Sequence, residues 1–445
     1  MPSRLRQLTL ASVLACAAWA APAAAAEDPQ VLGSQRLSPR LQELTLRTSE
    51  LAGSTAVRVL LPAGYREHPA RRYPVLYLLH GASGDQRSWT TEGQGDAESL
   101  TAALPLIVVM PNAGKGGFYT NWFNNGRGGT PRWENWHIKR LIPFIDGRYR
   151  TRAMGAGRAI AGLSMGGFGT FSYAARHPDL FTSALSLSGA VDTSTPPGVA
   201  PEIIDSISAA DGGPPGSLWG PRATQEVRWR AHNPWDLAEN LRGLALWLRT
   251  GNGQPGGPFG GGPDLDITEV GVAAQAFTVH QRLRELGIPH VFDDYGPGHH
   301  LWAYWNRGLR QTLPAIMARL RGGSRPPAKM TFTAAEPSYA AYGWGVRVKR
   351  PAMEFSRLAK AGRRGFSLSG SGSATVSTAR LFVPRHAYRI VLHTPKGLVR
   401  RSLSASARGR LRISVPLGPG NPGQQFTAGA TTRVFKTTVT IAPAG

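Results

Sequence analysis

Ser164 is the residue of this sequence best placed to act as a nucleophile. It lies in Gly162-Leu163-Ser164-Met165-Gly166, a G-x-S-x-G pattern. The pattern by itself is weak, since a chain with 54 glycines can contain it by chance. Its context is stronger, because an apolar run typical of a buried strand precedes it and a helical pattern follows it. In that strand-turn-helix order, a sharp turn exposes the serine hydroxyl at the rim of a sheet.

A serine needs a base to become nucleophilic at neutral pH, and the usual base is a histidine oriented by a carboxylate. His300 ends a loop between a predicted strand and a terminal helix, in the stretch YGPGHHLWAYW. The adjacent His299 cannot share its direction, and we expect His177, in the helix after the serine, to be structural. We therefore predict that His300 is the base.

Three acidic residues are candidates to orient His300, and the pattern of residues does not separate them. All of them follow the predicted strand at 244–251, and each is within reach of an imidazole at the sheet edge. One of the three begins a helical pattern, so it can also be read as an acid that stabilises a helix N-terminus. The candidates are Asp264, Asp266 and Glu269, the last being the one at the helix start.

Two backbone N–H groups are predicted to stabilise an oxyanion. The N–H of Met165 lies at the N-terminus of the helix that follows the serine, where the helix dipole favours negative charge. The second donor is expected in the loop after an earlier strand. In LLHGASGDQRSW, Gly81 lets the backbone turn so that the N–H of Ala82 faces the serine. The alternative for this loop is a plain turn.

Aromatic side chains near these motifs are candidates for the wall of an acyl or sugar pocket, although core packing is their commoner role. The candidates are Trp302, Trp122 and Tyr119. We expect no metal or organic cofactor, because the sequence has neither an H-E-x-x-H motif nor a phosphate-binding glycine motif. Cys16 is the only cysteine, which leaves the rest of the chain without a thiol nucleophile or a Cys-based metal site.

An α/β fold with a mostly parallel sheet is predicted to position these residues. Between residues 55 and 320, short apolar runs alternate with helical patterns. The expected strands are 56–62, 74–80, 105–111, 158–164, 184–189, 244–251 and 289–295, and the expected helices are 134–149, 166–178, 269–287 and 301–321. Two Pro- and Gly-rich segments, 191–220 and 251–264, are expected to be loops at the ligand-binding edge of the sheet.

The first 26 residues are typical of a secretory signal peptide. Arg4 and Arg6 precede an apolar run that ends in small residues near Ala26. A membrane anchor is the alternative, but alanines dilute the run and Pro22 interrupts it. No second apolar run approaches 18 residues, so we expect a secreted or envelope-associated chain without a transmembrane segment in its mature form.

The remaining chain divides into an α/β domain at 27–322, a linker at 323–330 and a basic domain at 331–445. Short strands separated by turns predict a small β-sandwich for the last domain. From residue 325 to the end, 20 Lys and Arg stand against two acidic residues, a net +18. This charge predicts binding to an anionic cell-envelope polymer, without specific recognition of nucleic acid. The alternative is a cationic sandwich that only packs against the first domain.

Several stretches resemble the putative-esterase branch of the α/β-hydrolase superfamily. This branch includes S-formylglutathione hydrolases, feruloyl and acetylxylan esterases, and the antigen 85 mycolyltransferases. The resemblance extends from about residue 45 to 320, and GGFYTNWF, SLWGP, RAHNPWDLAENL, LWLRTGNG and HHLWAYW carry it. It implies that Ser164, Glu269 and His300 form a catalytic triad, with the N–H groups of Ala82 and Met165 as the oxyanion hole.

Two departures separate this chain from the mycolyltransferases. His80-Gly81 and Ser83 stand where that group carries Asp-Gly and a nearby arginine that contacts sugar. The run from Ser164 to Gly167 also follows the hydrolases. The resemblance therefore favours a hydrolase over transfer of mycolate to trehalose.

These observations predict a secreted serine esterase or acyltransferase that works through an acyl-enzyme on a small-molecule or sugar ester. Water or a sugar hydroxyl would accept the acyl group. The alternative is a non-catalytic protein that binds envelope polymer through its basic domain. Removal of residues 325–445 should lower retention on anionic polymer and leave hydrolysis of small esters nearly intact.

Overall fold

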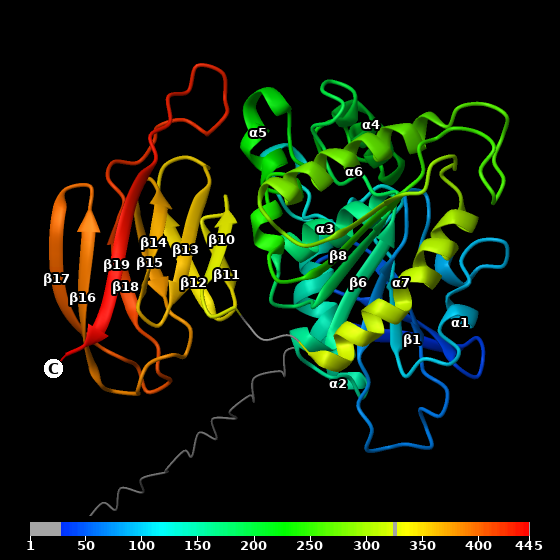
Figure 1. Ribbon diagram of the computed structural model, residues 1–445, viewed down its shortest axis with the longest axis horizontal. Helices are drawn as coiled ribbons and strands as arrows, with labels where there is room; N and C mark the ends of the chain where they lie inside the picture. The colour runs from blue at the N-terminus through cyan, green and yellow to red at the C-terminus, as the bar shows by residue number, and fades with distance from the viewer. Residues whose placement is uncertain (1–27, 324–326, 445) are drawn as a thin grey trace, which may run out of the picture.

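Two bodies with separate hydrophobic cores make up the part of the chain that the computed structural model describes, residues 28–323 and 327–444 (Figure 1). The predicted signal peptide lies outside these residues. The first body is an α/β domain with a large, mostly parallel sheet, and the second is built from antiparallel strands alone. The predicted fold class is therefore confirmed.

Within residues 28–323, nine strands form one sheet in the order β1-β2-β3-β5-β4-β6-β7-β8-β9. The strands from β5 to β9 run parallel, whereas β1, β2 and β3 pair antiparallel with one another and with β5. Strands β4 to β7 are buried along their whole length, which explains their continuous apolar character. The strands are β1 (Gln30–Arg36), β2 (Leu41–Arg47), β3 (Ser54–Leu60), β4 (Val75–Leu79), β5 (Ile107–Pro111), β6 (Arg158–Leu163), β7 (Ser183–Leu187), β8 (Ala245–Thr250) and β9 (Val291–Asp294).

Helices cover both faces of this sheet (Figure 1). Helices α2, α3 and α6 pack into the core on one face, and α1 and α7 into the core on the other. A stretch of π-helix at Asn135–Leu141 leads directly into α2. The helices are α1 (Ala97–Leu100), α2 (Ile142–Arg148), α3 (Met165–Arg176), α4 (Ala200–Ser208), α5 (Arg222–Arg230), α6 (Ile267–Glu285) and α7 (Trp302–Gly322).

The structure corrects the prediction that segment 191–220 is a loop. It contains α4, with Pro201 in its first turn and Gly212 in the left-handed conformation just after its C-terminal end. These are the positions where proline and glycine bound a helix rather than prevent one. Segment 251–264 has no helix or strand.

The C-terminal domain is a β-sandwich whose two sheets share one core. One sheet has the order β10-β13-β14-β19-β16-β17, and the other has the order β11-β12-β15-β18. Apolar side chains alternate inward along most strands, as expected for sheets with one solvent-facing side. The strands are β10 (Met330–Ala334), β11 (Ser338–Ala341), β12 (Trp344–Lys349), β13 (Ser356–Gly362), β14 (Gly365–Gly370), β15 (Ser373–Ser377), β16 (Ala387–Thr394), β17 (Gly397–Ser404), β18 (Arg412–Pro416) and β19 (Phe435–Pro443).

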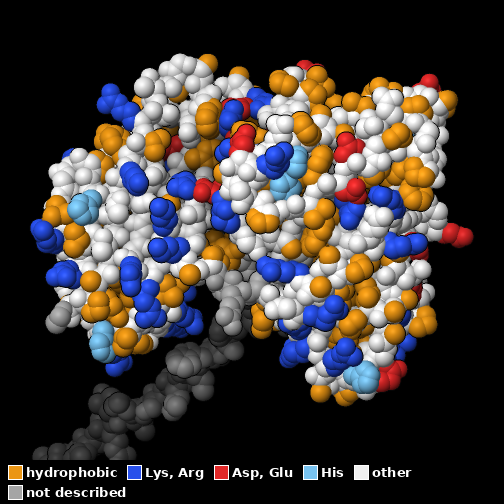
Figure 2. Space-filling view, in the orientation of Figure 1, with side chains coloured by type: hydrophobic (Ala, Val, Ile, Leu, Met, Phe, Trp, Pro, Cys, Tyr) orange, Lys and Arg blue, Asp and Glu red, His pale blue; other side chains and the backbone are white. Residues whose placement is uncertain are grey.

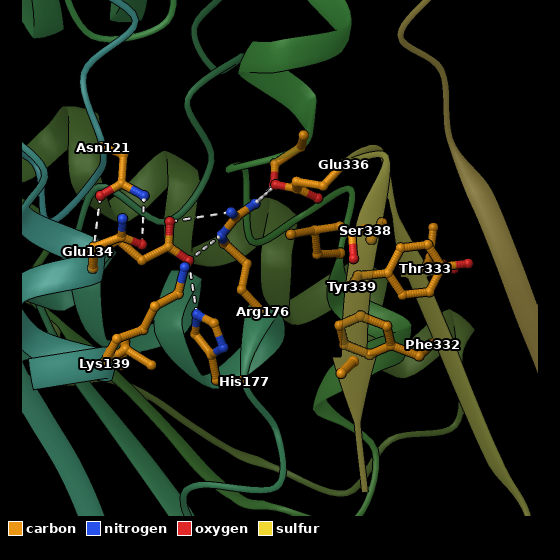
Figure 3. A pocket seen from close by; sticks show the side chains of 16 residues that line it. Asn121, Glu134, Lys139, Arg176, His177, Phe332, Thr333, Glu336, Ser338 and Tyr339 are labelled. Atoms are coloured by element: carbon orange, nitrogen blue, oxygen red, sulfur yellow. Dashed lines mark hydrogen bonds and ion pairs between the residues drawn. The ribbon is translucent and has the colours of Figure 1, made fainter. Parts of the chain in front are cut away.

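A cluster of partly buried charges around the buried Glu134 joins the two domains. Arg176, the last residue of α3, donates to both carboxylate oxygens of Glu134 and also pairs with Glu336 of the C-terminal domain at 2.6 Å (Figure 3). His177 contacts the same Glu134 carboxylate at 2.7 Å. Burial alone would raise the pKa of Glu134, but the charges of Arg176 and His177 hold it well below its usual range. The end of α3 is thus fixed from both sides.

Further contacts at this boundary show that the domains are not independent. Asn240 exchanges two hydrogen bonds of 2.8 Å with the backbone of Thr333. Ala335 packs against the buried side chains of Val227 and Ala231. Removal of residues 325–445 would expose this apolar contact and take one partner from Arg176. We therefore expect the truncated chain to be less stable than the full chain, which weakens the expectation that the deletion leaves ester hydrolysis nearly intact.

Replacing Glu134 with Gln should lower the free energy of unfolding by about 3 kcal/mol, because Arg176 would lose its bidentate partner inside the protein. Glu336→Gln should cost about 1 kcal/mol, since Glu134 still neutralises the guanidinium. Urea unfolding curves measure both. Because the folded pKa of Glu134 is depressed, its contribution is present at neutral pH and is lost as the pH falls through that depressed value. Equal losses for the two variants would contradict this assignment.

Candidate active site

Ser164 occupies a strained turn between β6 and α3. Its φ is +52° and its ψ is −121°, a conformation that is costly for a residue with a side chain. Close packing imposes this turn: a Cβ at Gly166 would lie 2.5 Å from the carbonyl oxygen of His80 and 2.6 Å from that of Leu79. Only glycine allows α3 to begin so near the end of β4. The turn leaves the Ser164 side chain half-buried at the carboxyl edge of the sheet.

Ser164 and His300 line the same cavity, which has a volume of about 360 Å³. His300 comes from the loop between β9 and α7, as predicted. One wall comes from Ile207 of α4, so the segment at 191–220 contributes to the cavity, whereas no residue of segment 251–264 lines it. The lining residues are Gly81, Ala82, Ser83, Gly84, Ser88, Gln94, Leu163, Ser164, Ile207, Thr268, His300, Trp302 and Trp305.

The carboxylate that contacts His300 is that of Glu269. Its Oε2 lies 2.7 Å from Nδ1 of His300. The other oxygen, Oε1, accepts hydrogen bonds from the Gly251 N–H at 2.7 Å, the Ser188 hydroxyl at 2.8 Å and the Thr250 hydroxyl at 3.0 Å. The Glu269 side chain is fully buried, so these four contacts fix its orientation. Among the three acids that the sequence left open, the geometry selects this one.

Asp266 holds the backbone around this pair rather than the imidazole itself. Its Oδ1 accepts from the N–H groups of Thr268 and Glu269 and so caps α6. Its Oδ2 accepts from the backbone N–H of His300 at 2.7 Å. Burial would raise the pKa of Asp266, but these N–H donors lower it. Asp264, the third candidate, is exposed in the loop before the cap.

Ala82 lines the cavity, and Met165 follows Ser164 directly as the first residue of α3. Within the part of the chain that the structure describes, neither the N–H of Ala82 nor that of Met165 has a hydrogen-bond partner. The loop that carries Ala82 is tied down on its other side, because Ser83, at φ +61°, donates its N–H to the carbonyl of Lys115 at 2.7 Å. Both N–H groups are therefore free to bind a negative oxygen.

His80 positions this loop, a role that the sequence reasoning missed. Burial lowers its pKa, which favours the neutral ring. Its Nδ1 lies 2.7 Å from the carbonyl of Gly81, and its Nε2 accepts the N–H of Ala113 at 3.0 Å. The hydroxyl of Tyr119 donates to the carbonyl of His80 at 2.9 Å. The His-Gly pair after a buried strand was the available signal.

The predicted aromatic residues fall in different places. Trp302 lines the cavity, whereas Tyr119 and Trp122 are buried in the core and do not. Core packing, the commoner role of such residues, is therefore what the structure gives Tyr119 and Trp122. The sequence reasoning missed Trp305, whose ring packs edge-on against His300 with centroids 4.9 Å apart. Its Nε1–H also donates to the hydroxyl of Ser188 at 3.1 Å.

Two other histidines lie away from the serine. His299 is buried beside Gly261, and His177 lies at the domain boundary. In residues 28–323 and 327–444, no three His, Cys, Asp or Glu side chains are grouped so that they could hold a metal ion. The helices of the same residues include none with the length and apolar character needed to cross a membrane.

The fold and this cavity define an α/β-hydrolase, and comparison with known proteins places the chain more closely. It belongs to the family described as "Putative esterase", whose model matches residues 48–316. The predicted membership of this branch is therefore confirmed. The C-terminal domain lies outside the matched region.

The relatives described next come from mycobacteria. The esterase Rv1288 of Mycobacterium tuberculosis is 36% identical over 288 residues, which cover 64% of this chain and 60% of that protein. The diacylglycerol acyltransferase/mycolyltransferase Ag85B of Mycolicibacterium smegmatis is 30% identical over 258 residues, 54% of this chain and 75% of that protein. Among solved structures, Mycobacterium tuberculosis MPT51 matches with a TM-score of 0.50 and 24% identity, over 62% of this chain and 98% of that one.

Glu269→Gln should lower kcat by about 10⁴-fold, because an amide cannot hold His300 in the tautomer whose free nitrogen accepts a proton. Asp264→Asn is the matched control and should leave kcat unchanged. Asp266→Asn should have an intermediate effect, since it weakens only the support of the backbone. Steady-state hydrolysis of a p-nitrophenyl ester measures all three variants. A large loss in Asp264→Asn, with Glu269→Gln active, would overturn the assignment.

Gly166→Ala should damage both stability and activity, because its Cβ would meet the backbone of β4 and push α3 outward. We expect a loss of about 1–3 kcal/mol in the free energy of unfolding and a fall of about 100-fold in kcat/KM. Gly271→Ala on α6 is the control, since its Cβ would have nothing within 4 Å. Activity in Gly166→Ala equal to that of the control would show that the close approach is not required.

Proposed function

We propose that this chain is a serine esterase that hydrolyses small carboxylic esters through an acyl-enzyme. One observation carries the proposal: His300, bonded through Nδ1 to the buried Glu269, borders the same cavity as the strained Ser164. Membership of an esterase family supports the reaction class. The buried Glu269 carboxylate has four contacts that fix it against one imidazole. This arrangement also favours an enzyme over a protein that only binds polymer.

The first half of the reaction forms the acyl-enzyme. Nε2 of His300 takes the proton of the Ser164 hydroxyl while Oγ attacks the carbonyl carbon of the ester. The N–H groups of Ala82 and Met165 stabilise the resulting oxyanion, and one such donor is typically worth about 3 kcal/mol. When the ester C–O bond breaks, His300 returns the proton to the departing alcohol. Glu269 stabilises the imidazolium throughout.

The second half releases the acid. His300 takes a proton from water, whose oxygen attacks the acyl carbon, and then returns this proton to Ser164 Oγ as the acyl bond breaks. A sugar hydroxyl could replace water, which would make the chain an acyltransferase, the activity for which Ag85B is named. We favour water because Ser83 and the run after Ser164 follow the hydrolase pattern.

The size and lining of the cavity suggest a small acyl group. Its volume of about 360 Å³ lies near the lower end for ligand pockets. Leu163, Ile207 and Trp302 provide an apolar wall, and Ser88 and Gln94 provide polar groups. We therefore propose short aliphatic or single-ring acyl groups as substrates. The signal-peptide pattern in residues 1–26 supports a secreted or envelope-associated location.

Ser164→Ala should reduce kcat for p-nitrophenyl acetate by about 10⁶-fold, since it removes the nucleophile. Wild type should also prefer acetate and butyrate over palmitate, because the long chain exceeds the cavity. Hydrolysis rates for the three esters test both expectations, and a thermal melt shows that the variant is folded. Turnover by a folded Ser164→Ala protein that equals wild type would reject the mechanism.

A further inference from the structure

The two acidic residues of the C-terminal domain do not lie on its outer sheet faces. Residues 327–444 contain 19 Lys and Arg but only Glu336 and Glu354 as acids. Glu354 is buried, where it pairs with Arg350 and accepts hydrogen bonds from Ser371 and Asn421. Glu336 faces the α/β domain and pairs with Arg176. The outer faces of the two sheets therefore carry positive side chains without a carboxylate among them.

One of these faces forms a shallow groove bordered by both charged and apolar side chains. The outward side chains of β16 include Arg389, Val391 and His393, and Arg400 of β17 lies directly across from Val391. On the other side of β16, Thr440 of β19 is the partner of Val391. These residues border a groove of about 350 Å³. Arginine and threonine side chains thus point outward together along three adjacent strands.

The groove lies on the part of the domain that is far from the α/β domain. Figure 1 shows β16 and β17 at the outer side of the molecule, with β10 and β11 between them and the α/β domain. Figure 2 shows blue side chains scattered over the same domain and few red ones. A long ligand can therefore lie across β16 and β17 without blocking the cavity at Ser164.

The surface is poorly suited to ligands that bind by stacking. The large aromatic side chains of the domain point inward, including Trp344, Phe366 and Phe382. Phe426 is exposed, but the guanidinium of Arg230 covers its ring at 4.4 Å. Single-stranded nucleic acids usually bind on aromatic platforms, and none borders this groove. No helix is present among residues 327–444 to enter a groove of duplex DNA.

We propose that the outer face of β16, β17 and β19 binds a phosphate-bearing glycopolymer of the cell envelope. The guanidinium groups of Arg389 and Arg400 can each bind a phosphate with two parallel hydrogen bonds. Threonine hydroxyls on β19 can donate to the same oxygens. A sheet face presents these groups at regular spacing, which matches a linear polymer with repeated charges. The surface then holds the esterase at the envelope, in addition to the proposed reaction.

The test compares two double variants of the full chain that lose the same charge. Arg389→Ser/Arg400→Ser removes both arginines of the groove. Arg363→Ser/Arg364→Ser, in the turn between β13 and β14, is the control. Binding to immobilised poly(glycerol phosphate) teichoic acid is measured over a range of NaCl concentrations. Unchanged hydrolysis of p-nitrophenyl acetate shows that each variant is folded, and neutral dextran is the uncharged comparison.

We expect wild type to bind the teichoic acid and not the dextran. The groove variant should lose about tenfold in affinity, and its slope of log K against log salt should fall by about 1.4 for two lost phosphate contacts. The control should change less than twofold. Equal losses in both variants would mean that net charge alone causes binding and would overturn the proposal. Absence of binding by wild type, or tighter binding to duplex DNA than to the teichoic acid, would also overturn it.

Discussion

The close approach of α3 to the end of β4 is the constraint on which the rest of the site depends. Because a side chain at Gly166 would meet the backbone of His80, the chain must turn sharply at Ser164. Met165 follows this turn as the first residue of α3, and Ala82 lies in the loop after β4. The other end of α3 carries Arg176, which is held by Glu134 and Glu336. One helix therefore links the candidate nucleophile to the domain boundary.

Local motifs were sufficient to predict much of this site, but long-range choices were not. Ser164 and His300 were predictable because each follows a strand, and a run of consecutive residues is enough to predict that strand. The choice among the three acidic residues was not predictable from sequence. It depends on Asp266, which caps α6 and thereby turns Glu269 inward. The strands expected between 55 and 320 correspond to β3 to β9, and the expected helices correspond to α2, α3, α6 and α7. Helices α1 and α5 were not expected. Helix α4 was missed because its proline and glycine mark its ends, and in sequence they suggest a loop.

In the C-terminal domain, the positions of the charged residues could not be predicted from the sequence either. Composition alone predicts a basic domain, but it does not say whether the two glutamates lie on its outer surface. The fold places Glu354 inside the sandwich and Glu336 at the domain boundary, so the outer sheet faces remain positive. Composition likewise does not show how the two domains meet, whereas in the structure Asn240 and Arg176 connect them by specific contacts. The position of a few polar residues, rather than their number, decides both properties.

The most direct test of the central claim is to locate the covalent adduct that a fluorophosphonate forms with the intact protein. A hydroxyl activated by His300 should react once per chain, and peptide mass spectrometry should place the adduct on Ser164. Loss of ester hydrolysis should follow the extent of labelling. An adduct on a different residue, or hydrolysis that continues after Ser164 is fully labelled, would contradict the account.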